Sequence, residues 1–208
     1  MGFKQVAIVG LAESTHDDAP YNNPFWEMWG LPWDEGKYPH FERLFDIHPL
    51  ECIRAATPSF YRQGYEDRLR ELEGILYMQQ AYEDIPNAVE YPLEQVSMLV
   101  GDYYNSSIAY MLGLAIYEKY DRIGLWGVDM KEKGEWGHAN EYRDERPNCE
   151  YLLGFAKARG IDIYIPPKSP LLKFSGEFPL GTVIPHYGVR YGFLSDGFSY
   201  QENKTCKT

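Results

Sequence analysis

The sequence predicts an α/β fold, in which a mostly parallel sheet carries helices on both faces. A short apolar run over 6–9 ends at Gly10 and indicates a strand buried on both faces, as a parallel sheet requires. From 106 to 165 the pattern is helix, strand, helix, strand, which indicates right-handed crossovers between parallel strands. Together these two observations are typical of a Rossmann-like domain.

The other elements follow along the chain from apolar spacing and from turn residues. We expect strands at 43–48, 75–78, 123–128 and 161–165. We expect helices at 59–72, 106–120 and 148–159, the last ended by Gly160. We expect a short helical turn and loop at 25–33 and a loop at 85–92, while 93–99 fits either a helix or a strand.

The length of 208 residues suits a single domain. Residues 1–177 hold all the predicted helices and strands, and we expect them to form a Rossmann-like nucleotide-binding domain. Glycine and aromatic residues dominate after Phe174, so we expect 178–208 to form an irregular C-terminal tail or a lid.

The composition limits the partners that this chain could have. A net charge of −11 repels the phosphate backbone, which disfavours broad nucleic-acid binding, whereas a local pocket could still accept a small nucleotide. The three cysteines are scattered without CxxC spacing, so we expect neither a zinc site nor a disulfide framework, and a reducing cytoplasm is the natural compartment. We recognise no signal peptide and no apolar run near about 18 residues, so we expect no membrane partner.

The loop after the first strand is the first candidate site. Gly10 would let the backbone approach a phosphate or a sugar, and Ser14 and Thr15 offer hydroxyl groups. The loop is neither a GxGxxG motif nor a P-loop, and an ordinary turn between elements explains it equally well.

Two further candidates flank the strand predicted at 123–128. Asn105, Ser106 and Ser107 precede the clearest helix, where they could cap its N-terminus and also bind an anion. Gly127 and Asp129 follow the strand, where a carboxylate could meet a ribose hydroxyl or a base edge, or could simply cap the next segment.

The remaining candidates are catalytic groups. His138 could act as a general base, and Tyr142 or Arg143 could hold phosphate oxygens, although a histidine in a loop is more often a surface residue. His48 before Pro49 is the other histidine in a functional position, and His16 lies close to the first loop. No set of His, Asp and Glu residues has recognisable metal spacing, so we predict no metal site.

The segment 105–130, from Asn105-Ser106-Ser107 to Gly127-Val128-Asp129-Met130, resembles the core of the bacterial CMP-sialic-acid-dependent sialyltransferases. It is also similar to the Rossmann-like domain of flagellin motility accessory factors, and the chain resembles uncharacterised bacteriophage-encoded proteins with the same turn. The opening 6–14 is similar to their nucleotide loop, with Leu11-Ala12-Glu13 in place of its usual Asn-Gly. The resemblance implies a nucleotide near Gly10, Ser14, Ser106, Ser107, Gly127 and Asp129, and a catalytic base near His138.

These observations lead to the hypothesis of a glycosyltransferase-like enzyme that uses a nucleotide or nucleotide-sugar ligand and no other implied cofactor. His138 would deprotonate an acceptor hydroxyl, while Tyr142 or Arg143 would stabilise the departing phosphate. Two alternatives stay open: a non-catalytic phage-type binder that sequesters a nucleotide signal, and a nucleotide hydrolase. The aromatic segment 26–29 fits a homodimer contact, an acceptor platform or packing over the sheet, and a phage-encoded protein would act in the host cytoplasm.

Overall fold

The computed structural model describes residues 2–32, 40–55, 64–131 and 139–173. The chain divides into one compact unit at 1–171 and a second at 172–208. The proposed boundary at 177 and the tail at 178–208 lie outside the described residues.

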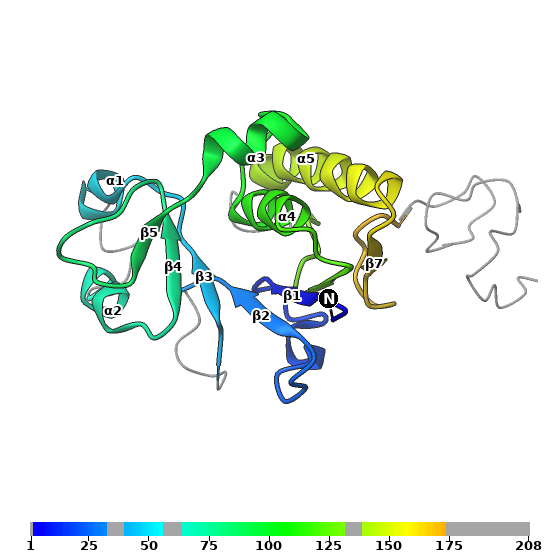
Figure 1. Ribbon diagram of the computed structural model, residues 1–208, viewed down its shortest axis with the longest axis horizontal. Coiled ribbons are helices and arrows are strands. Elements are labelled where there is room, and N and C mark those ends of the chain that lie inside the picture. Colours follow the sequence, from blue (N-terminus) through cyan, green and yellow to red (C-terminus); the bar gives the residue numbers. More distant parts are fainter. Residues whose placement is uncertain (1, 33–39, 56–63, 132–138, 174–208) are drawn as a thin grey trace, which may run out of the picture. The chain divides into compact units, whose positions relative to one another are not determined.

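The first unit is built on a seven-stranded parallel sheet with the spatial order β5-β4-β3-β2-β1-β6-β7 (Figure 1). The strands are β1 (Gln5–Val9), β2 (Glu27–Gly30), β3 (Arg43–Phe45), β4 (Ile75–Met78), β5 (Ala88–Glu90), β6 (Arg122–Trp126) and β7 (Asp162–Tyr164). Strands β2 to β5 follow one another on one side of β1, and β6 and β7 then lie on the other side of β1. The point where the direction of building reverses, between β1 and β6, is where open α/β sheets bind ligands.

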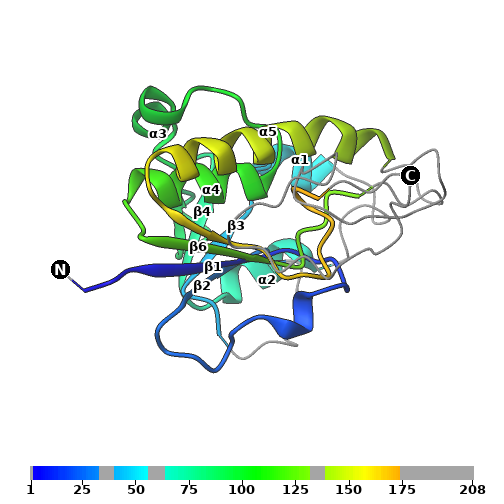
Figure 2. The same ribbon diagram turned by 90° about the vertical axis from the view of Figure 1, so that its right-hand side faces the viewer.

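Helices cover both faces of the sheet (Figure 2), which confirms the predicted α/β fold of Rossmann-like type. They are η1 (His16–Asp18), α1 (Leu50–Ala55), α2 (Tyr65–Glu71), α3 (Leu93–Val100), α4 (Ser107–Tyr117) and α5 (Ala139–Ala158). Helix α4 packs against β1, α3 and α5. Leu50 of α1 and Leu69 of α2 pack with Leu44 and Leu76 of strands β3 and β4.

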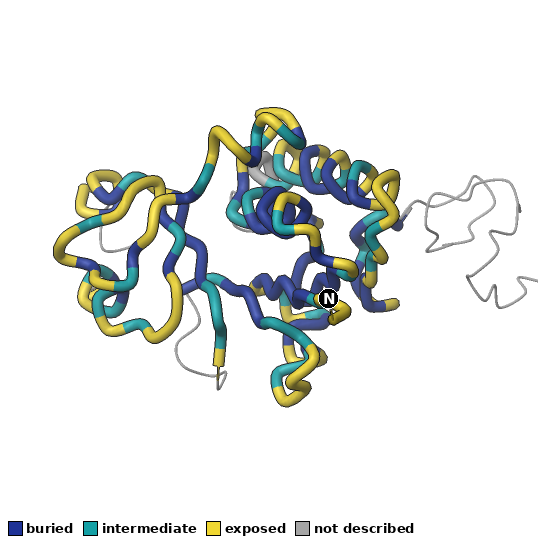
Figure 3. The backbone as a smooth tube through the Cα atoms, viewed as in Figure 1, coloured by how far each residue is buried: buried dark blue, intermediate teal, exposed yellow. Residues whose placement is uncertain are grey.

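The core runs along the central strands and α4 (Figure 3). Eight of the nine residues from 108 to 116 in α4 are buried, and Tyr110 is the exception, so this helix has almost no solvent face. A helix that is apolar nearly all round must be enclosed. Its position is therefore fixed by the sheet below and by α3 and α5 beside it.

Three sequence-based expectations were wrong. The segment 25–33 contains strand β2, whose Met28 and Trp29 are buried, so these two side chains cannot form a surface contact for a second copy or an acceptor. The segment 85–92 contains edge strand β5. Helix α5 begins at Ala139 instead of 148 and includes Pro147, so Tyr142 and Arg143 are helical and do not belong to a loop.

The end of α4 gives a testable consequence for stability. Lys119 follows the helix with φ of 60°, a left-handed conformation that disfavours every residue with a Cβ atom. Since this side chain is exposed, we expect Lys119→Gly to stabilise the fold by about 1 kcal/mol in urea unfolding. Lys157→Gly, inside the last turn of α5, should instead destabilise it by about 1 kcal/mol. A loss of stability in Lys119→Gly would contradict this account of the α4 terminus.

Candidate functional site

The backbones of β1 and β6 meet at a pair of glycines where both strands end. A Cβ atom on Gly10 would lie 2.5 Å from the carbonyl oxygen of Gly127, and one on Gly127 would lie 2.3 Å from that of Gly10. Gly127 also has a φ of +61°. The peptide N–H groups of Gly10 and Ala12 donate to the carbonyls of Trp126 and Gly127, both at 2.8 Å. The two glycines are thus required by the contact between the strands, whether or not a ligand is bound.

The first loop is tied to the turn after β6 by side chains as well. The Ser14 hydroxyl donates to Asp129 Oδ1 at 2.6 Å, and the Gly127 N–H donates to Thr15 Oγ1 at 2.8 Å. Ser14 and Asp129 are half-buried, while Thr15 is buried. The structure therefore brings five of the predicted residues together at the switch point, namely Gly10, Ser14, Thr15, Gly127 and Asp129. Ser14 and Asp129 are partly exposed to solvent, whereas Thr15 is enclosed.

His16 is a structural residue of this loop. It is buried, and its Nδ1–H donates to the carbonyl of Gly10 at 2.5 Å. This bond holds the end of β1 in place from the side of η1. Among the described residues, no group of three His, Cys, Asp or Glu side chains could hold a metal ion.

The N-terminus of α4 lies at the same edge of the sheet, because a helix that leads into a parallel strand must run from the carboxyl edge back to the amino edge. Ser106 caps the helix, with its Oγ accepting the N–H of Ala109 at 3.2 Å, which confirms the predicted capping role. Ser107 begins the helix and is half-buried. Because α5 also leads into a parallel strand, Tyr142 and Arg143 near its start approach this edge too, the first half-buried and the second exposed.

Asn148 of α5 was not predicted, although it lies directly beside the α4 N-terminus. Its Nδ2 donates to Asn105 Oδ1 and, at 3.1 Å, to the carbonyl of Asp144. Both acceptors fix the orientation of the amide, since a flip would set oxygen against oxygen. The side chain is fully buried, and its Oδ1 has no hydrogen-bond partner.

A histidine and an aspartate form a second cluster at the end of β3. Asp46 is buried and accepts the Nδ1–H of His48 at 2.5 Å and the Tyr65 hydroxyl at 2.8 Å. His48 was a candidate from the sequence, whereas Asp46 was missed. The spacing Asp-x-His could have indicated the pairing of Asp46 with His48. The contact with Tyr65 could not be predicted, because it forms between the end of β3 and a helix that is distant in the sequence. His138, the other candidate base, lies outside the described residues.

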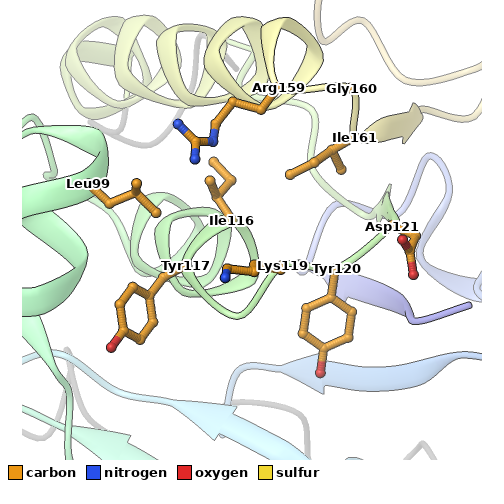
Figure 4. A pocket seen from close by; sticks show the side chains of 9 residues that line it. All are labelled: Leu99, Ile116, Tyr117, Lys119, Tyr120, Asp121, Arg159, Gly160 and Ile161. Carbon is orange, nitrogen blue, oxygen red and sulfur yellow. The ribbon is translucent and has the colours of Figure 1, made fainter. Parts of the chain in front are cut away.

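A cavity of about 410 Å³ lies elsewhere (Figure 4). It is lined by the C-terminal end of α4, by Lys119 and Arg159, which follow α4 and α5, and by Asp121 before β6. These elements end or begin at the amino edge of the sheet, opposite the candidate residues. None of the candidate site residues named from the sequence lines this cavity.

The comparisons with known proteins give a distant likeness. No family model and no curated protein matches the chain. The chain is similar to the sialyltransferase CstII from Campylobacter jejuni in complex with CMP-3FNeuAc, at 16% identity over 82% of this chain and 84% of that one, with a TM-score of 0.47. It is also similar to an alpha-2,3-sialyltransferase from Campylobacter jejuni in apo form, at 13% identity over 78% and 75%, with a TM-score of 0.45. Likenesses this distant leave the ligand and the reaction to be argued from the residues of this chain.

No helix in the described part of the chain is both long and apolar enough to cross a membrane.

The glycine contact predicts a difference between two substitutions. Gly127 and Gly160 both have positive φ, but a Cβ atom on Gly160 would meet no atom within 4 Å. Gly160→Ala should therefore cost only the left-handed backbone, about 1 kcal/mol. Gly127→Ala adds a backbone collision and should cost more than about 3 kcal/mol in chemical unfolding. Equal losses would mean that the strand contact is not as close as described.

Cys149 beside the α4 N-terminus should be chemically inert. Burial raises the pKa of its thiol to about 12, against a smaller lowering by the Ser106 hydroxyl at 3.7 Å. At pH 8 only about one molecule in ten thousand would then carry the reactive thiolate. Iodoacetamide at that pH should label exposed Cys52 and leave Cys149 unmodified, as measured by peptide mass spectrometry. Rapid labelling of Cys149 in the folded chain would contradict the enclosed position.

Proposed function

We propose that the chain binds a nucleotide or nucleotide-sugar at the carboxyl edge between β1 and β6, and that it transfers a group from this ligand to an acceptor. The observation that carries the proposal is the unpartnered Asn148 Oδ1 beside the N-terminus of α4. A buried polar atom without a partner costs about 1–3 kcal/mol. A bound ligand that donates a hydrogen bond would recover this energy.

The polar groups at this edge suit different parts of a nucleotide. Asn148 Oδ1 and the Asp129 carboxylate are acceptors, so they suit donors such as ribose hydroxyls or the amino group of a base. Backbone N–H groups at a helix N-terminus suit a phosphate, and Ser106 and Ser107 stand at that end of α4. The acceptor groups would thus bind the nucleoside, and the donor groups would bind the phosphate.

The remaining candidate residues take supporting roles in the proposal. Ser14 orients the Asp129 carboxylate through its hydrogen bond, and Gly10, Gly127 and Thr15 hold the two loops together. Tyr142 and Arg143 approach from α5, where Arg143 could neutralise a departing phosphate. An arginine here would offset the net charge of −11 where an anionic ligand must enter.

The test is a thermal-shift panel of CMP, UMP, AMP, GMP, CMP-N-acetylneuraminic acid, UDP-glucose and GDP-mannose, followed by mass spectrometry of each mixture. We expect at least one ligand to stabilise the chain. Asp129→Asn should weaken its affinity about tenfold, equivalent to one lost charged hydrogen bond of about 1.4 kcal/mol. Asp162→Asn is the matched control: Asp162 is exposed at the start of β7, where it pairs with Arg122 of β6, and its substitution should not alter binding.

Each other outcome has a defined meaning. No stabilisation by any member of the panel, or equal affinity in Asp129→Asn, would overturn the site. A ligand that binds and is recovered intact with every acceptor offered would indicate a sequestering binder. Conversion in water alone, with no need for an acceptor, would indicate a hydrolase.

A further inference from the structure

Asp46 and His48 form a carboxylate–imidazole pair directly beyond the carboxyl end of β3. Oδ1 of Asp46 accepts the His48 Nδ1–H at 2.5 Å and the His48 backbone N–H at 3.2 Å. Its Oδ2 accepts the hydroxyl of Tyr65, the first residue of α2, at 2.8 Å. The carboxylate is therefore held from two separate elements, and it holds the imidazole in one orientation.

The arrangement also fixes which nitrogen of His48 can take up a proton. A carboxylate only accepts, so Nδ1 carries the hydrogen, and Nε2 is the nitrogen that can act as a base. The Asp46 side chain is fully buried, while that of His48 is 46% exposed. The ring is thus anchored through Nδ1 to a carboxylate in the protein interior, while nearly half of the side chain is exposed.

The pair has more connections than a local turn requires. An Asp side chain that accepts the backbone N–H two residues later forms an Asx turn, as Asp46 does here before Pro49 and α1. Such a turn uses only one carboxylate oxygen. Asp46 uses the second oxygen to bind a distant helix, and it does so while 1% exposed. In the described part of the chain, His48 is the one basic side chain that pairs with it. The buried carboxylate of Asp46, held against the ring, stabilises the imidazolium that forms when His48 takes up a proton.

The pair lies on the same edge of the sheet as the proposed nucleotide site. Ile8 pairs with Trp29 and Trp29 pairs with Arg43, so Gly10 stands level with Phe45, one residue before Asp46. Strands β1 and β3 are separated by β2 alone, which sets their ends about 10 Å apart. A nucleotide-sugar bound at β1 and β6 can direct its transferable group toward this side.

We propose that His48 is the general base of the transfer reaction and that Asp46 is its positioning residue. This inference rests on the proposed function and gives His48 the role that the sequence suggests for His138. The acceptor hydroxyl gives its proton to His48 Nε2, and its oxygen forms a bond to the transferred carbon. The bond from that carbon to the phosphate oxygen breaks, and its electron pair leaves with the nucleotide.

The test compares full-length wild type with His48→Ala, Asp46→Asn and the control His40→Gln, whose histidine is exposed beside Glu42. For every donor that the wild type converts, nucleotide release and nucleotide affinity are both measured. His48→Ala should lower kcat by about 100-fold or more while the Kd for the nucleotide stays within about threefold. Added imidazole should restore part of the turnover in His48→Ala, which a merely structural role would not allow. Asp46→Asn should lower kcat without changing KM, and His40→Gln should match the wild type.

The two proposals fail in different ways. If nucleotide binds and is turned over equally by wild type and His48→Ala, the base is wrong while the proposed function stands. Loss of turnover in His48→Ala that imidazole leaves unchanged, together with a lowered melting temperature, would also overturn the catalytic role. If the wild type binds or converts no nucleotide donor, the proposed function fails and this inference fails with it.

Discussion

The contact between the backbones of Gly10 and Gly127 is the constraint on which the rest of the edge depends. It joins the ends of β1 and β6, so that the loop after one strand and the turn after the other lie against each other. The Thr15 hydroxyl stabilises this contact by accepting the Gly127 N–H, and the His16 ring stabilises it by donating to the Gly10 carbonyl. Thr15 and His16 are thus satisfied within the protein, whereas Ser14 and Asp129 are half-buried, bond to each other, and belong to the ligand site in our proposal.

The parallel topology explains how chemically useful groups gather from distant parts of the sequence. All strands end at one edge, and helices α4 and α5 begin there. Asp46, Asp129 and Asn148 therefore belong to one side of the molecule, although about 100 residues separate Asp46 from Asn148. The cavity lined by Lys119 and Arg159 belongs to the opposite edge and offers none of these groups.

The sequence predicts most of the fold but only part of the site, for physical reasons. Strands β1 and β6 and helix α4 can be recognised in the sequence because most of their residues are buried and their apolar runs are nearly continuous. Strand β4 is also an apolar run, although Ile75 at its start is exposed. Strand β2 cannot be recognised in this way, since it has only four residues, begins with Glu27 and ends with Gly30, and so shows no continuous apolar run. Ser106 is found because capping is local, whereas the roles of Asp46 and Asn148 depend on Tyr65 and Asn105, which only the folded chain brings near.

The central claim is that a nucleotide occupies the carboxyl edge between β1 and β6. Its most direct test is a crystal structure of the full chain grown with the nucleotide that stabilises it most. We expect electron density for the ligand beside Asp129, Ser107 and Asn148, with a hydrogen bond from the ligand to Asn148 Oδ1. Ligand density in the cavity at the amino edge, with the carboxyl edge filled by water, would contradict it.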